Sequence, residues 1–254
     1  MSNPQHEARA ALEAAGRLPD AELDIAGVAL QFARVDQPVA DWHAATEHLT
    51  GIARAAVQAA AADRQADAGD LLRRRAALAE LLHGGLGYAG DAQSYDDLAN
   101  ANLLRVIERR RGLPVALGIL WLHAAEAAGW PAHGVDFPGH FLVALVGRGQ
   151  VVVDVFGGGA PLDARDLRSL LKKFAGAAAE LGPDTLAPMS KRAVLLRLQN
   201  NIKLRRLREG DLAGATACTE DMLRLAPDTA PLWREAGLMH QRLGHITAAI
   251  MSLE

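Results

Sequence analysis

The fold is decided by residues 111–156, which read RGLPVALGILWLHAAEAAGWPAHGVDFPGHFLVALVGRGQVVVDVF. Pro114 suits the first turn of a helix, where its missing N–H would have no partner in any case. From there to residue 128 the sequence is apolar around nearly the whole circumference of a helix, which is typical of a buried helix. Gly129 and Pro131 end that helix. The pattern therefore predicts a central core helix over residues 114–128.

The residues that follow predict a β-hairpin. Residues 141–146 and 151–153 are apolar runs on either side of Gly147-Arg148-Gly149. Branched apolar residues that flank a short glycine-containing loop are typical of two antiparallel strands. Because both runs are apolar throughout, we expect layers of the protein to cover both faces of the sheet.

The hairpin register brings two polar residues together. With residues 147–149 as the loop, Leu142 lies opposite Asp154, and His140 lies opposite Phe156. His140 and Asp154 then share one face as a diagonal pair, whose Cα atoms are about 7–8 Å apart. A loop of two or four residues would place them on opposite faces. We therefore predict that the two side chains interact, either as a structural hydrogen-bonded pair or as part of a functional site.

Composition excludes several classes of protein. The 254 residues carry 27 Lys and Arg against 30 Asp and Glu, so a basic surface for nucleic acid or an anionic membrane is not expected. A single cysteine, Cys218, excludes an internal disulfide framework and a cysteine-rich zinc site. No apolar run is long enough to span a membrane. The first ten residues include His6, Glu7 and Arg9, where a secretory signal would be apolar, and we expect a cytoplasmic protein.

Three regions are predicted along the chain. Residues 1–90 form a helical region, with helices expected over 21–34, 39–62 and 66–83 and with Asp20 as the cap of the first. Residues 91–186 contain the core helix and the hairpin, followed by a helix near residues 164–181. The fold class is α+β: a helical layer over a small antiparallel sheet.

Residues 187–254 form the third region, and they repeat. Gly210 and Gly244 are 34 positions apart, as are Leu212 and Ile246, and this period is typical of tetratricopeptide helix pairs. About three repeats normally make a stable stack. We therefore expect this short array to lean on the preceding residues, or the sequence to be truncated at Glu254. The groove of the repeats is a candidate site for a protein or peptide, whereas its arginines could equally be a solvated surface.

Several motifs in combination resemble one family. The order of a buried helix, a strand with His and a strand with Asp resembles the transglutaminase-like superfamily, and the finer pattern is similar to its bacterial SirB-one branch. The stretches that carry this resemblance include Tyr95-Asp96, Gly112-Leu113-Pro114, Pro138-Gly139-His140-Phe141, Val153-Asp154 and Leu198-Gln199-Asn200-Asn201. The resemblance implies a papain-like core followed by tetratricopeptide repeats.

The resemblance also defines a site that lacks its nucleophile. Active members of the superfamily place a cysteine at the start of the helix, with the His activating the thiol and the Asp orienting the His. Here the corresponding positions are Pro114, Val115 and Ala116, which carry no nucleophilic atom. His140 and Asp154 remain as a dyad. The SirB-one family generally lacks the cysteine as well.

Two kinds of function follow from these observations. The first is a non-catalytic cytoplasmic adaptor or regulator that binds a protein or peptide through its repeats and needs no cofactor or metal. The alternative is an acyl-transfer or hydrolase-type enzyme in which His140 and Asp154 activate water or a metal-bound hydroxide. The residues that could ligate a metal in that case are His133, Asp136, His140 and Asp154. Exposure of His140 beside Pro114 would favour a ligand site, and enclosure by side chains would favour a structural pair.

Overall fold

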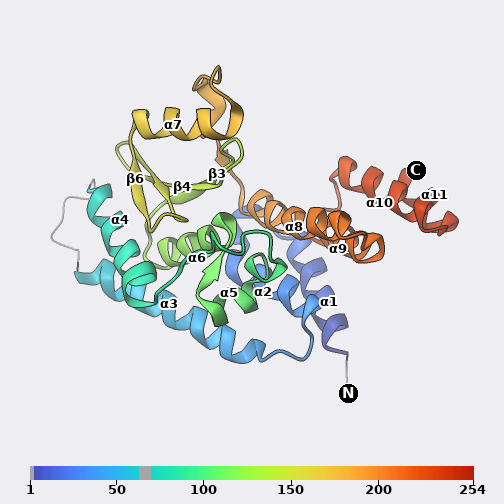
Figure 1. The fold of residues 1–254 in the computed structure, drawn as a ribbon. Helices are drawn as coiled ribbons and strands as arrows, with labels where there is room; N and C mark the ends of the chain where they lie inside the picture. The colour runs from blue at the N-terminus through green and yellow to red at the C-terminus, as the bar shows by residue number, and fades with distance from the viewer. Residues whose placement is uncertain (1–2, 63–69) are drawn as a thin grey trace.

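The computed structural model describes residues 3–62 and 70–254, and it confirms the α+β class (Figure 1). Helices make up most of the chain, and a small sheet lies in its middle third. The α-helices are α1 (Pro4–Gly16), α2 (Ile25–Asp36), α3 (Trp42–Ala62), α4 (Leu71–Ala79), α5 (Leu103–Arg109), α6 (Pro114–Ala127), α7 (Ala164–Ala175), α8 (Lys191–Arg208), α9 (Leu212–Leu225), α10 (Ala230–Arg242) and α11 (Ile246–Leu253).

The main sheet is antiparallel throughout, and its strand order is β6-β5-β4-β3-β7. A separate parallel pair, β1 with β2, lies directly before α6. The predicted hairpin is β4 and β5, joined by a loop of three residues. The strands are β1 (Ala89–Gly90), β2 (Arg111–Gly112), β3 (Ala132–Val135), β4 (Leu142–Val146), β5 (Gln150–Asp154), β6 (Ala160–Leu162) and β7 (Pro188–Met189).

Helix α6 is the centre of the core, as the sequence predicts. It begins at Pro114, and eleven of its residues are buried, including the whole run from Pro114 to Leu122. It contacts the sheet through β3 and β4, and it contacts α2, α3 and α8 on its other sides. Because Gly118 has no side chain, the ring of Phe141 can approach the helix backbone closely. The helix is therefore surrounded by protein along its length.

A second layer covers the opposite face of the sheet. Val143 and Val153 belong to the main core, whereas Leu142 and Val152 belong to a smaller apolar cluster that includes Leu167 of α7. Neighbouring residues of a strand point to opposite faces, so α6 and α7 lie on the two sides of the sheet (Figure 1). The expectation of a sheet covered on both faces is confirmed.

Helix α7 is shorter than predicted. It begins after Asp163, which caps it in a capping box with Asp166. The sequence pattern favours a helix to residue 181, but α7 ends at Ala175. Gly176 adopts φ 96°, a conformation that a helix cannot continue.

The N-terminal helices follow the sequence pattern with shifted boundaries. Helix α2 begins at Ile25, and its cap is Asp24, whose carboxylate accepts the amide N–H of Gly27 at 3.0 Å. The prediction of Asp20 as this cap is wrong. Asp20 instead accepts the amide N–H groups of Lys191 and Arg192, at 2.9 and 2.8 Å, and so supplements Ser190, the N-cap of α8. Two amides of the first turn of α8 are thus satisfied by a residue about 170 positions away.

The third predicted helix is divided between two kinds of helical turn. Its expected start near residue 66 lies outside the described residues. From Leu71 to Ala79 the chain is α-helical, and residues Glu80–Gly85 continue it as a π-helical turn. The glycine-rich stretch then ends the helix, as predicted.

The repeats form two helix pairs, α8 with α9 and α10 with α11. Gly210 and Gly244 occupy equivalent turns, with φ of 80° and 76°, so the 34-residue period has a structural basis. The expectation that the array leans on the preceding residues is met by α1, which packs against α9, and by α2, which contacts α8. The repeats are therefore continuous with the N-terminal helices.

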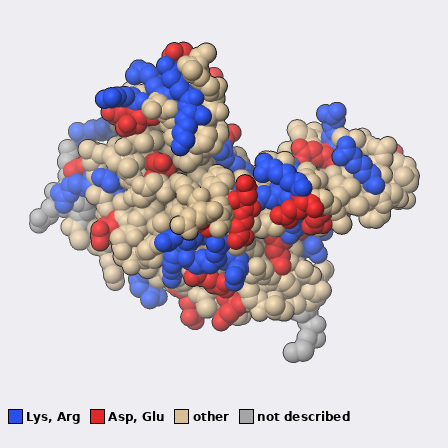
Figure 2. Space-filling view, in the orientation of Figure 1, with Lys and Arg blue, Asp and Glu red and all other residues tan. Residues whose placement is uncertain are grey.

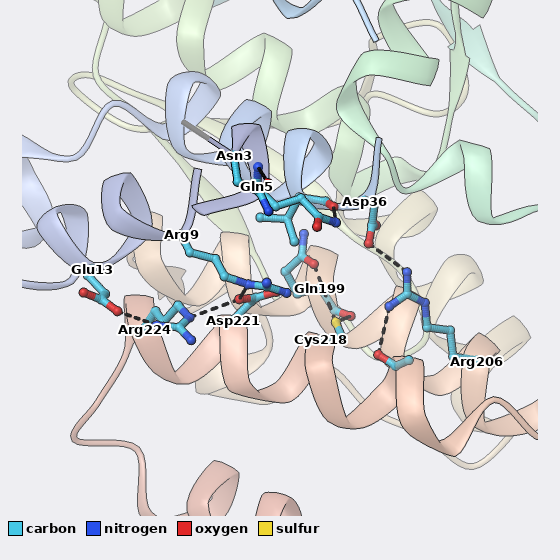
Figure 3. A network of polar contacts seen from close by, with 12 residues as sticks. Asn3, Gln5, Arg9, Glu13, Asp36, Gln199, Arg206, Cys218, Asp221 and Arg224 are labelled. Carbon is cyan, nitrogen blue, oxygen red and sulfur yellow. Dashed lines mark hydrogen bonds and ion pairs between the residues drawn. The ribbon is translucent and has the colours of Figure 1, made fainter. Parts of the chain in front are cut away.

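Ion pairs reinforce the contact between α1 and the repeats (Figure 3). The guanidinium of Arg9 binds the Asp221 carboxylate at 2.9 Å, and Arg224 pairs with Glu13. Gly16 allows α1 to end directly against the backbone of α9, since a Cβ there would lie 2.2 Å from the carbonyl oxygen of Arg224. The repeats and α1 consequently form one packed unit.

Charge is distributed in patches of both signs. On the face shown in Figure 2, Lys and Arg side chains form separate groups, and acidic side chains lie beside them. Among the described residues, no helix is both long enough and apolar enough to cross a bilayer.

Candidate functional site

The turn before β4 positions His140. Phe137, Pro138, Gly139 and His140 form a β-turn in which the amide N–H of His140 donates to the carbonyl of Phe137 at 2.9 Å. Gly139 has φ 70°, and proline precedes it, which is the pattern of a type II turn. A side chain at Gly139 would meet the Phe174 side chain at 2.6 Å. The glycine therefore lets α7 pack directly over the turn.

The hairpin register then brings His140 to Asp154. Val143 pairs with Val153 and Val146 with Gln150, so the loop contains the three residues that the sequence predicts. His140 and Asp154 lie in phase with Leu142 and Val152, on the face that α7 covers. The imidazole Nε2 and the carboxylate Oδ1 are 3.1 Å apart. The predicted interaction between the two side chains is present.

The Asp154 carboxylate has other partners besides the imidazole. The same Oδ1 accepts the amide N–H of Phe156 at 3.0 Å. Burial by itself raises the pKa of Asp154, but the hydrogen bond and charge of His140 and the amides of Phe156 and Gly157 together lower it below its ordinary value. The carboxylate is therefore held in its ionised form, as a group that orients an imidazole must be.

Aromatic rings enclose His140. Its side chain is 8% exposed. The ring of Phe174 stacks on the imidazole, with centroids 5.5 Å apart and planes 9° apart. The ring of Phe156 meets the imidazole edge-on, at 84° and 6.3 Å, and also closes over the backbone of Gly90. This enclosure of His140 favours a structural pair over an open ligand site.

The positions that correspond to the missing nucleophile are deep in the core. Val115 is 2% exposed and Ala116 is fully buried, in the first turn of α6. Pro114 begins the helix and is buried too. The side chains of Val115 and Ala116 pack in the main apolar cluster.

Cys218 does not replace the missing thiol. It lies on α9, 5% exposed, with its Sγ 3.6 Å from the carbonyl oxygen and from the side-chain oxygen of Gln199 (Figure 3). Burial, followed in size by the charge of Asp36, raises the pKa of this thiol to about 12. A thiol of that kind is not a nucleophile near neutral pH.

The four residues considered as metal ligands do not form a site. Asp136 forms an ion pair with Arg197, and the pKa of His133 is lowered by burial. His140 and Asp154 bind each other. In residues 3–62 and 70–254, no group of three or more His, Cys, Asp or Glu side chains is arranged to hold a metal ion. The metal-binding alternative therefore has no support from the arrangement of these four side chains.

The sequence interpretation missed the role of α8 at this site. Arg197 donates to the carbonyl oxygen of His140 at 2.5 Å and also binds Asp136. Two turns further on, Arg205 is 5% exposed and donates to the carbonyl oxygens of Tyr95 and Asp96, at 3.1 and 3.0 Å. The i, i+8 spacing of these arginines on one helix was a signal for a shared face. The alternative of a solvated surface is wrong for Arg205.

Comparisons with known proteins agree with this architecture. The model of the transglutaminase-like superfamily matches residues 43–200, and a tetratricopeptide-repeat model matches residues 202–254. The first match covers more than half of the chain. The chain therefore belongs to the transglutaminase-like superfamily and carries tetratricopeptide repeats after that domain.

Similar bacterial proteins indicate which branch of the superfamily the chain resembles. A UPF0162 protein of Xylella fastidiosa (strain Temecula1) is 36% identical over 188 residues, which are 71% of this chain and 66% of that protein. A UPF0162 protein of Vibrio cholerae is 31% identical over 62% of this chain and 58% of its own length. The chain thus spans just under two thirds of the first relative. These bacterial relatives confirm the resemblance to the SirB-one family.

A solved structure of menin is also similar. The chain matches it over 99% of its own length and 69% of that structure, with 11% identity and a TM-score of 0.46.

Proposed function

We propose that this protein is a non-catalytic member of the transglutaminase-like superfamily that acts as an adaptor or regulator in the cytoplasm. The observation that carries the proposal is the first turn of α6, where Pro114, Val115 and Ala116 offer no nucleophilic atom and are buried. The dyad of His140 and Asp154 then serves to hold the turn before β4 against β5. A protein or peptide, not nucleic acid or membrane, is the partner, and the repeats bind it.

Support for the interaction role comes from the repeats. Tetratricopeptide arrays present concave surfaces between successive helix pairs. In this chain large apolar side chains on α8 and α10 remain exposed after folding, among them Leu204 at 42% and Leu238 at 44%. Both leucines line the same hollow between α8 and α10, where a partner could cover them.

A turnover assay tests the proposal against the enzymatic alternative. Purified protein is incubated with a glutamine-donor peptide and an amine acceptor, and separately with p-nitrophenyl esters. We expect no turnover above the buffer rate. The matched variants are His140→Ala and His245→Ala, the latter an exposed histidine in the repeats. Turnover by the parent that disappears in His140→Ala and persists in His245→Ala would establish the hydrolase or acyl-transfer alternative.

A partner experiment tests the positive half of the proposal. The full chain, carrying a photo-cross-linker, is mixed with extract of its source cell, and cross-linked proteins are identified and then purified for binding to the unmodified chain. We expect at least one protein that binds the purified chain reversibly and saturably, with cross-links on α8 to α11. Absence of any saturable partner would remove the adaptor function.

A further inference from the structure

A hollow of about 420 Å³ lies between α8 and α10. We call it the inter-repeat groove, and its apolar lining is Leu204 and Leu207 of α8 with Leu238 and the buried Met239 of α10. These leucines are 42%, 38% and 44% exposed. Leu204 and Leu207 are one turn apart on the same helix face, so their side chains form a short stripe along the groove. Its volume is within the range of ordinary binding sites.

The charges around the groove are unequal. Lys203 and Arg242 line it as cations, and Glu235 is the anion among its lining residues. Glu235 is already paired with Lys203, whose side chain is 5% exposed. Arg242 is exposed at the end of α10, and it forms none of the ion pairs found within residues 3–62 and 70–254. The groove therefore offers one uncompensated cation beside its leucine stripe.

The last turn of α8 carries a further exposed cation, Arg208. Arg208 is 68% exposed and lies 3.6 Å from the carboxylate of Asp96, which is itself 77% exposed. An exposed pair of this kind contributes little energy, so Arg208 can exchange its partner readily. A carboxylate brought to the groove would meet Arg242 in its lining, and Arg208 follows Leu207 directly at the end of α8.

We propose that the inter-repeat groove binds a protein segment that presents leucine-sized apolar side chains with Asp or Glu beside them. The inference rests on the proposed adaptor function, because it names the chemistry of the partner. A peptide suits the groove better than a small molecule, since the apolar positions are distributed over two helices. Carboxylates bind guanidinium groups with charge-assisted hydrogen bonds, which give both specificity and a faster encounter.

An unbiased selection tests this chemistry. A random peptide library displayed on phage is selected against the full chain, and the composition of the enriched peptides is counted. We expect enrichment of Leu, Ile or Phe together with Asp or Glu. A synthetic copy of the most enriched peptide is then used as the probe in titrations. Selection of basic peptides, or of none that bind measurably, would overturn the proposal.

Three variants locate the bound peptide. Leu238→Asp places a charge in the stripe, and Arg242→Glu reverses the uncompensated cation. Arg234→Glu is the matched control, because Arg234 is exposed on the same helix but lines a different hollow with Met251. We expect each groove variant to weaken binding by about tenfold or more, and the control to stay within about twofold. A repeat selection with Arg242→Glu should shift enrichment from acidic to basic residues.

The outcomes separate this inference from the proposed function. If a cell partner binds the purified chain and is insensitive to Leu238→Asp and Arg242→Glu, the adaptor function stands and the groove is not its site. Equal effects of Arg234→Glu and Arg242→Glu would show that overall charge, and not the groove, governs binding. Circular dichroism and thermal unfolding of each variant confirm that a loss of binding does not reflect unfolding.

Discussion

Replacement of His140 by alanine should destabilise the fold without abolishing it. The variant loses the 3.1 Å hydrogen bond between Nε2 and Asp154, and the carboxylate keeps only backbone amide donors. Leaving a buried polar group without its partner costs about 1–3 kcal/mol. The stacked contact with Phe174 contributes about a further 0.5–1.5 kcal/mol. Because Asp154 is 22% exposed and water can replace part of the bond, we expect a total loss of about 2 kcal/mol.

The assay is urea unfolding followed by circular dichroism, on the parent, His140→Ala, Asp154→Ala and the double variant. If the pair is structural, the double variant should be less destabilised than the sum of the single variants, with a coupling of about 0.5–3 kcal/mol. Single losses that simply add, or a His140→Ala variant as stable as the parent, would refute the structural role of the pair.

The pH dependence of the same variants provides an independent check. The pKa of Asp154 is lowered in the folded state, so its contribution to stability is present above the unfolded-state value of about 3.9 and is lost as the pH falls through the folded-state pKa. We therefore expect the stability difference between parent and His140→Ala to be full at neutral pH and to shrink on acidification.

Three further predictions concern packing, reactivity and pH. Gly16→Ala should destabilise the protein by about 1–3 kcal/mol, because the new Cβ would overlap the α9 backbone. Gly51→Ala on α3 is the control and should stabilise the protein by about 0.5–1 kcal/mol, because nothing lies within 4 Å of the new Cβ. Thermal unfolding compares the two variants, and equal effects would contradict the docking of α1 on the repeats. Cys218 should react with a disulfide reagent in absorbance assays only after denaturation, because burial raises its pKa to about 12; rapid labelling of the native protein would contradict its placement. The pKa values of His48 and His83 are lowered in the folded state, mainly by burial. The unfolded chain therefore binds more protons than the folded chain below about pH 6.5, and the free energy of unfolding should fall as the pH decreases there. A free energy of unfolding that stays constant between pH 7 and 5.5 would contradict this.

The sequence predicts best where the structure depends on local rules. The hairpin is the strongest case, since a three-residue loop fixes the register and the register fixes which residues meet Asp154. The buried helix from Pro114 is similar, because a segment that is apolar on all sides can only lie inside. The spacing of Gly210 and Gly244 also suffices, because each glycine allows a positive φ at the same point of the repeat.

Long-range partners explain most of what the sequence does not predict. Nothing near Asp20 indicates that its carboxylate binds the first turn of α8 beside the N-cap Ser190, because the amide groups whose hydrogen bonds it accepts lie some 170 residues away. Enclosure of His140 by Phe174 depends in the same way on where α7 packs. Local capping rules identify the right residue type and assign it to the nearest helix, but in the folded protein Asp20 binds the amide groups of a distant helix.

Helix α8 connects the two features on which the functional argument depends. On one side, Arg197 and Arg205 hold the carbonyl oxygens of His140 and of the loop at Tyr95. On another, Leu204 and Leu207 line the inter-repeat groove. Rotation of α8 at the groove would therefore disturb the contact of Arg197 with the His140 carbonyl and the buried contacts of Arg205 with the loop at Tyr95. In the structural role that we propose for it, the enclosed dyad holds the turn whose carbonyl oxygen Arg197 of α8 binds, and a His–Asp pair is then useful even where residues 114–116 carry no nucleophilic atom.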